Sequence, residues 1–144
     1  MFNKFCKKQL WECSKELAAT ALGTIPAETV ITNAKLINVC TKEIMDNTDI
    51  AIHSGGIALV GDASHCIGKE TKVIDAQGMY VAPGMLDGHI HIESSMLCPG
   101  EYARAVVPHG TTGIYYDPHE ICNVLGFEGV ELMVKDAERT PLKA

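Results

Sequence analysis

Two histidines separated by a single residue are the strongest candidates for chemistry in this chain. His89 and His91 lie in the run Asp-Gly-His-Ile-His-Ile-Glu, which follows a Pro-Gly turn at residues 83–84. The run alternates with period two, so one face of a predicted strand carries four polar side chains: Asp87, His89, His91 and Glu93. Because a strand rises by about 3.3 Å per residue, the two imidazoles start roughly 7 Å apart and can reach one ion.

The same pattern has a plainer interpretation. Two histidines on one strand face are also typical of a solvated polar surface that binds nothing, and the spacing alone leaves both readings open. The Pro-Gly turn before the strand and the acidic residues Asp87 and Glu93 on either side of the pair favour the metal site. The apolar residues on the opposite face, Leu86, Ile90 and Ile92, predict that the strand packs against other elements.

Two helices and a second strand are expected to follow. Pro99 begins a predicted helix of about ten residues, with Tyr102, Ala105 and Val106 on its apolar face. A strand is predicted at 111–116 and an amphipathic helix at 127–138. The order strand, helix, strand, helix is typical of a parallel sheet or barrel.

Polar residues directly after the second strand are further site candidates. His119 and Glu120 follow its carboxyl end, where barrel enzymes place their catalytic side chains. Asp117 fits an ordinary turn or cap residue. His109 precedes the strand, at the opposite end, and is expected to be structural.

The first part of the chain predicts a helix and then a β unit. A helix is expected over 3–22, with an apolar stripe at Cys6, Leu10, Cys13, Leu17 and Ala21 that Trp11 widens. Short runs joined by tight turns follow and predict a small antiparallel β-sandwich: 29–32, 35–39, 49–52, 57–60, 72–75 and 79–82. The expected domains are therefore an N-terminal helix at 1–24, a β-sandwich-like unit at 25–82 and the start of a barrel at 83–144. The fold class is α/β with a β-sandwich part.

Composition narrows the classes of partner. The chain has 144 residues, 47% of them hydrophobic, and a formal net charge of −6. No basic field is present to hold nucleic acid or an anionic membrane, and no run approaches the length of a transmembrane helix. The six cysteines form no Cys-x-x-Cys pair and are interpreted as reduced thiols, although an even number also permits disulfides. A cytoplasmic protein is expected.

Longer runs around these residues resemble a known family. The segment 80–97, Tyr-Val-Ala-Pro-Gly-Met-Leu-Asp-Gly-His-Ile-His-Ile-Glu-Ser-Ser-Met-Leu, resembles the amidohydrolase superfamily and, within it, the bacterial adenine deaminases. The runs at 106–112 and 117–124 resemble the same family, and the resemblance extends from about Glu28 to the C-terminus. It implies that water hydrolyses a cyclic amidine C–N bond, converting adenine to hypoxanthine and ammonia.

The resemblance also implies roles for individual residues. His89 and His91 match the first metal ligands of the family, which holds one or two divalent ions, Mn²⁺ or Fe²⁺, in the barrel mouth. Asp87 is expected to support the imidazoles or the local structure. Glu93 either reaches the substrate, positions a ligand or is a solvated strand-end carboxylate. His119 and Glu120 are expected in the pocket, as catalytic residues.

Length sets a limit on what the chain is expected to do alone. A (β/α)₈ barrel needs on the order of 200–250 residues, and only the first two βα units of such a barrel are expected here. The chain is therefore expected to be truncated, inactive alone, and prone to self-association through exposed apolar residues such as Leu86, Ile90 and Ile114. Two alternatives stay open, a non-catalytic amidohydrolase fragment and a small metal-binding module that uses His89, His91 and His119. The zinc nucleobase deaminase motif fails, because Cys98-Pro99 has the wrong order.

Overall fold

The computed structural model describes residues 8–144. The chain forms two compact units, one that ends at Pro83 and one that spans Gly84–Ala144. The expected helix begins later than its sequence pattern suggested. It is α1 (Leu10–Ala21), and residues 3–7 of the expected range, Cys6 included, lie outside the described residues.

Only part of the expected stripe on α1 is buried. Cys13 and Leu17 are buried, and Leu17 lies against Gly56, where an added Cβ would be 3.2 Å from its side chain. Leu10 and Trp11 are instead 71% and 75% exposed. Thr20 occupies the third buried position, so the buried face is narrower than the apolar pattern indicated.

The first unit contains one five-stranded sheet in the order β3-β2-β1-β4, with β5 also paired to β1. The strands are β1 (Thr29–Asn38), β2 (Glu43–His53), β3 (Gly56–Gly61), β4 (Lys72–Asp75) and β5 (Tyr80–Val81). The hairpin between β2 and β3 is confirmed, with Ser54 and Gly55 at positive φ as a tight turn requires. Ala27, Val30, Ala51, Ala63 and Cys66 form the core of this unit.

The expectation of an antiparallel unit is wrong for two strands. Both β4 and β5 run parallel to β1, so this sheet is mixed. The turn expected at Asn33 is a bulge within one continuous β1, and the bend at 76–78 lies beside it. Asn33 at φ 55° accepts a hydrogen bond from the Gly78 N–H at 2.8 Å. β4 precedes the bend at 76–78 and pairs with β1 before Asn33, whereas β5 follows that bend and pairs with β1 after Asn33. The two strands therefore both pair with β1 instead of with each other.

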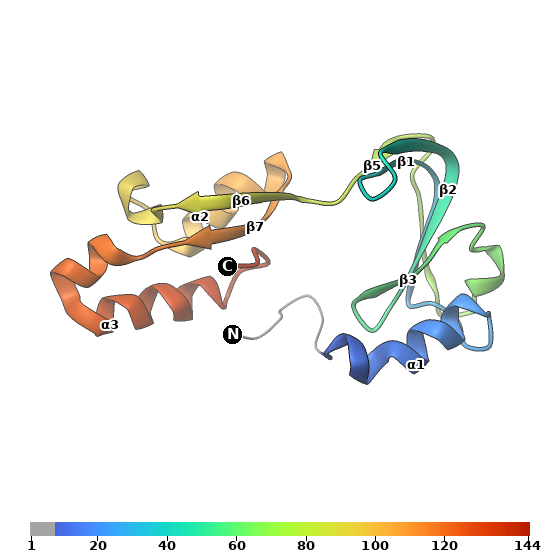
Figure 1. Ribbon diagram of the computed structural model, residues 1–144, viewed down its shortest axis with the longest axis horizontal. Helices are drawn as coiled ribbons and strands as arrows, with labels where there is room; N and C mark the ends of the chain where they lie inside the picture. Colours follow the sequence, from blue (N-terminus) through green and yellow to red (C-terminus); the bar gives the residue numbers. More distant parts are fainter. Residues whose placement is uncertain (1–7) are drawn as a thin grey trace. The chain divides into compact units, whose positions relative to one another are not determined.

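The second unit holds two parallel strands and two helices (Figure 1). Its elements are β6 (Met85–Ile90), the 3₁₀ turn η2 (Ile92–Ser95), α2 (Pro99–Val106), the 3₁₀ turn η3 (Val107–His109), β7 (Thr111–Tyr116) and α3 (His119–Ala137). The parallel pairing of β6 with β7, joined by α2, is confirmed. A buried core ties the elements together: Ile92, Ala103, Ile114, Met133 and Leu142.

Three details of this unit differ from the expectation. The helix expected at 127–138 begins at His119 and is interrupted at Gly126, whose φ of 62° and ψ of −151° are not helical. Ala103, and not Ala105, is the buried alanine of α2. Ile114 is only 5% exposed because it belongs to the core, so it cannot drive self-association; Leu86 is 70% exposed, as expected.

Candidate metal centre

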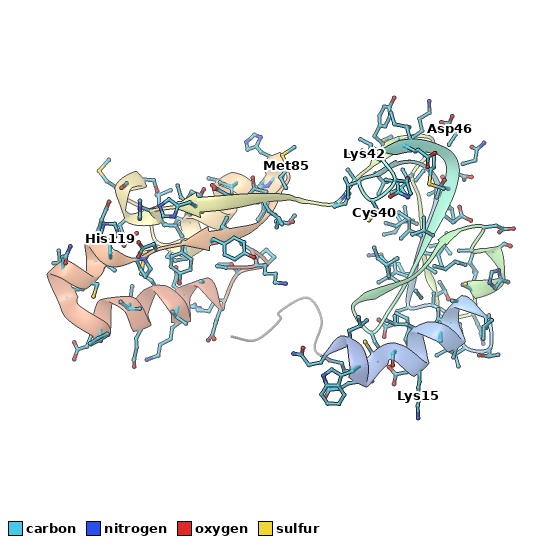
Figure 2. The ribbon with its side chains drawn as sticks, viewed as in Figure 1. Lys15, Cys40, Lys42, Asp46, Met85 and His119 are labelled. Carbon is cyan, nitrogen blue, oxygen red and sulfur yellow. The ribbon has the colours of Figure 1, made fainter. Side chains whose placement is uncertain are left out.

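The candidate site residues lie at one end of the second unit, where β6 and β7 end. Met85 begins β6, and His119 lies at the other end of the unit, where β7 has ended (Figure 2). Because β6 and β7 are parallel neighbours, the residues that follow them come together. His109 precedes β7 and therefore lies away from this group.

The imidazoles of His89 and His91 converge. Their Nε2 atoms are 3.0 Å apart and their ring centroids are 4.5 Å apart. His89 is in β6, whereas His91 follows the strand in extended backbone, with φ −103° and ψ 98°, and is the residue before η2. The extended conformation preserves the period-two alternation, and both rings therefore face the same side although the strand itself ends at Ile90.

A backbone contact fixes the tautomer of His91. Its Nδ1 is 3.0 Å from the carbonyl oxygen of Asp117. A carbonyl oxygen only accepts, so Nδ1 carries the hydrogen and the neutral ring presents a lone pair at Nε2. Metal-binding histidines are commonly oriented in this way by a carbonyl or carboxylate on the other nitrogen.

Asp87 accepts a hydrogen bond from the backbone and not from an imidazole ring. Its Oδ1 accepts a hydrogen bond from the backbone N–H of His89 at 3.1 Å. The carboxylate therefore holds the strand backbone next to the histidine. Of the two roles expected for Asp87, the contact fits the structural one.

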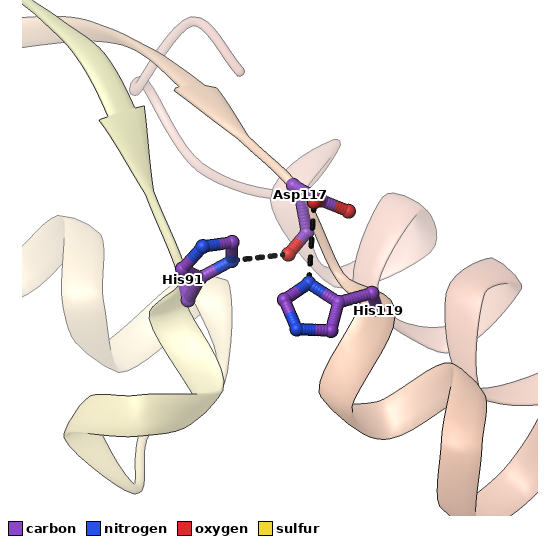
Figure 3. A group of neighbouring side chains, drawn as sticks. All are labelled: His91, Asp117 and His119. Atoms are coloured by element: carbon purple, nitrogen blue, oxygen red, sulfur yellow. Dashed lines mark hydrogen bonds and ion pairs between the residues drawn. The ribbon is translucent and has the colours of Figure 1, made fainter.

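A second group of donors adjoins the pair. Ligand atoms of His91, Asp117 and His119 all lie within 4.8 Å of one another, and Figure 3 shows the three side chains from the ends of the two strands. Nδ1 of His119 is 3.2 Å from Oδ2 of Asp117. The rings of His91 and His119 meet edge to face, with centroids 4.6 Å apart.

Asp117 is the member of this group that sequence reasoning did not select. The available signal was its position, directly after a strand that neighbours the His-x-His strand. The local pattern Asp-Pro-His equally fits a turn, and only the register of β6 against β7 brings the carboxylate to His91.

Glu93 is hydrogen-bonded to the helix that contains Glu120, and Glu120 is hydrogen-bonded to the turn that contains Glu93. Oε1 of Glu93 accepts a hydrogen bond from the Ile121 N–H at 3.3 Å, and Oε1 of Glu120 accepts one from the Ser94 hydroxyl at 2.6 Å. Glu93 lies in η2 and is half-buried, so its reading as a solvated strand-end carboxylate is wrong. Burial raises the pKa of the nearby Tyr116, and the charge of Glu93 raises it further, which keeps the phenol protonated.

The donor set fits a divalent first-row metal ion. Imidazole nitrogens and carboxylate oxygens are the ligands that such ions use in hydrolytic sites. The lone pair on Nε2 of His91 faces Nε2 of His89 at 3.0 Å, and Asp117 and His119 supply further donors. No helix in the described part of the chain is long and apolar enough to cross a membrane.

The second unit resembles a known protein family. The profile of the amidohydrolase family matches residues 80–144. The match covers both strands, both helices and every donor described above.

Proteins named adenine deaminase are similar to this chain along nearly its whole length. The chain is 66% identical over 143 residues to an adenine deaminase of Clostridium botulinum (strain ATCC 19397 / Type A), covering 99% of this chain and 24% of that protein. It is 54% identical over 137 residues to the adenine deaminase of Moorella thermoacetica, covering 95% of this chain and 23% of that protein. The chain thus spans about a quarter of the relatives it matches. The similarity includes α1, although the sequence resemblance was placed only from about Glu28 onward.

Solved structures place the fold among amidohydrolase barrels. A prolidase in complex with N-methylphosphonate-L-proline is 20% identical with a TM-score of 0.51, over 67% of this chain and 28% of that chain. N-acyl-D-glutamate deacylase from Bordetella bronchiseptica, solved with zinc and a phosphonate inhibitor, is 24% identical with a TM-score of 0.50, over 62% and 18% of the two chains. The fold is therefore α/β and covers part of the amidohydrolase architecture.

Proposed function

We propose that this chain supplies the first metal ligands of an adenine deaminase, which hydrolyses adenine to hypoxanthine and ammonia. One observation carries the proposal. The Nε2 atoms of His89 and His91 meet at 3.0 Å beside Asp117 and His119, in a chain 66% identical to proteins named adenine deaminase. The same proposal includes adenine catabolism as the wider role and the cytoplasm as the location.

His89 and His91 would hold the ion, Mn²⁺ or Fe²⁺, with Asp117 as a neighbouring donor. A bound divalent ion lowers the pKa of its water to about 7, which makes a nucleophile available near neutral pH. The carbonyl of Asp117 keeps Nδ1 of His91 protonated and so directs Nε2 toward the ion. Asp87 keeps the backbone of His89 in place.

His119 and Glu120 are the groups of this chain that we assign to proton transfer. Deamination needs a proton delivered to the departing amine, and imidazoles and carboxylates perform such transfers. The Ser94 hydroxyl donates a hydrogen bond to Oε1 of Glu120. For Glu93 we take the positioning role, because its Oε1 contacts the backbone of α3.

A metal-binding module without catalysis is the second candidate. It is favoured by the group His91, Asp117 and His119, whose ligand atoms already lie within 4.8 Å of one another in this chain. The two candidates differ in one respect. Only the deaminase requires that these donors work together with further barrel strands.

A fusion protein tests the choice. This chain replaces the matching 143 residues of the Clostridium botulinum relative, and adenine conversion to hypoxanthine is measured with Mn²⁺ present. We expect a kcat/KM within about tenfold of the unaltered relative, because a tenfold loss corresponds to only about 1.4 kcal/mol. A fusion that folds and binds Mn²⁺ but leaves adenine unchanged would favour the metal-binding module.

A further inference from the structure

The turn after β6 is bonded to the start of α3 by two adjacent side chains. Glu93 Oε1 accepts the N–H of Ile121 at 3.3 Å, and the Ser94 hydroxyl donates to Oε1 of Glu120 at 2.6 Å. These residues, called here the Glu93–Ser94 pair, are consecutive in η2. Both of their partners lie in the first turn of α3, beside His119.

The first turn of α3 needs an acceptor from elsewhere. Pro118 occupies the N-cap position and provides no side-chain hydrogen bond. The first N–H groups of a helix have no partners within the helix, and a negative charge there is favourable to the helix dipole. The carboxylate of Glu93 meets both needs from a different element, and so joins the end of one strand to the helix that follows the other.

The burial of the Glu93 carboxylate supports a structural role for its contact with Ile121. Its Oε2 is buried and has no hydrogen-bond partner among the described residues. A buried carboxylate oxygen without a partner costs free energy. The contact with the Ile121 N–H therefore accompanies an unfavourable burial of Oε2. A carboxylate that contacts substrate would instead be exposed in the pocket.

We propose that Glu93 and Ser94 are positioning residues that fix His119 and Glu120 relative to His91. The proposal rests on the proposed function for the role of those three side chains. Glu93 acts through the backbone of α3, and Ser94 acts through the Glu120 carboxylate. Without the pair, His119 and Glu120 keep their chemistry but lose their fixed distance from the histidine pair.

Amide exchange in the 144-residue chain tests the geometry without metal. The variants are Glu93→Ala, which removes the acceptor, and Glu93→Gln, which keeps an acceptor oxygen. We expect Glu93→Ala to accelerate exchange of the Ile121 amide about tenfold and to weaken the nuclear Overhauser contact between the His91 and His119 rings. Glu93→Gln should stay near the unaltered chain in both measurements.

Serine variants give a matched control in the same turn. Ser95 donates its hydroxyl to the carbonyl of Ile92, within η2 itself. Ser94→Ala should therefore weaken the contact between the His91 and His119 rings, while Ser95→Ala leaves it unchanged. Ser94→Ala also carries the test if Glu93→Ala fails to fold. Unchanged Ile121 exchange in folded Glu93→Ala would overturn the role of Glu93, and equal effects of the two serine variants would overturn that of Ser94.

Kinetics of the fusion protein separate positioning from substrate contact. We expect Glu93→Ala to lower kcat at least tenfold with KM within twofold, and Glu93→Gln to restore most of kcat. A raised KM that Glu93→Gln does not rescue would assign Glu93 to the substrate and overturn the proposal. If the fusion is inactive throughout, the proposed function fails, and the exchange measurement still decides whether the pair positions α3.

Discussion

Replacing His91 with alanine in the fusion protein is expected to reduce bound metal and turnover together. The change removes the Nε2 lone pair that faces His89, and the Asp117 carbonyl loses its donor. Loss of residues that merely support a ligand typically costs 10–100-fold in metal affinity or activity. We therefore expect loss of the ligand itself to lower kcat/KM by at least about 100-fold. Metal content is measured by elemental analysis on the same samples.

His109 provides the matched control for this substitution. It is an exposed histidine of the same unit, and it precedes β7 instead of following it. His109→Ala should leave both metal content and kcat/KM within about twofold. Loss of turnover in His91→Ala with full metal content would assign His91 to a different step and remove it from the metal ligands.

The isolated 144-residue chain is expected to leave adenine unchanged. Its barrel part has two strands, β6 and β7. A complete (β/α)₈ barrel contributes catalytic groups from the ends of several strands. The assay is hypoxanthine formation with excess Mn²⁺ or Fe²⁺, beside the fusion protein at equal concentration. Sustained metal-dependent turnover by the chain alone would show that its own donors complete the site.

Local pattern was sufficient to predict the elements that carry the site. Pro99 at the start of α2, the parallel pairing of β6 with β7 and the hairpin between β2 and β3 all follow from short-range signals. Period two also placed the rings of His89 and His91 on one side. The start of α2, the hairpin and the two rings depend on residues close to one another in the sequence, whereas the pairing of β6 with β7 follows from the order strand, helix, strand.

Features that depend on distant pairing were missed. The parallel pairing of β4 and β5 with β1 follows from two bends, at Asn33 and at 76–78, that occur side by side only in the folded sheet. The burial of Ile114 beneath the helices likewise depends on which face of β7 they cover. A strand pattern cannot reveal which of its faces the helices will cover.

The candidate site shows the same limit. His119 and Glu120 were expected in the pocket because they follow a strand, but the contribution of Asp117 depends on the distance from its carbonyl and carboxylate to two separate histidines. Glu93 was expected at the end of the strand, on the face of the histidines, either at the substrate or a ligand or in solvent. The chain instead turns into η2 after His91, and that turn carries Glu93 to the backbone of α3.

The most direct measurement of the central claim is Mn²⁺ binding to the 144-residue chain by titration calorimetry. The account predicts saturable binding of one ion, weakened at least about 100-fold by His89→Ala combined with His91→Ala, and unchanged by His109→Ala. Circular dichroism on each sample confirms that the variants are folded. Equal Mn²⁺ affinity of the double variant and the unaltered chain would show that the ion binds elsewhere, and would contradict the assignment of the histidine pair as the metal site.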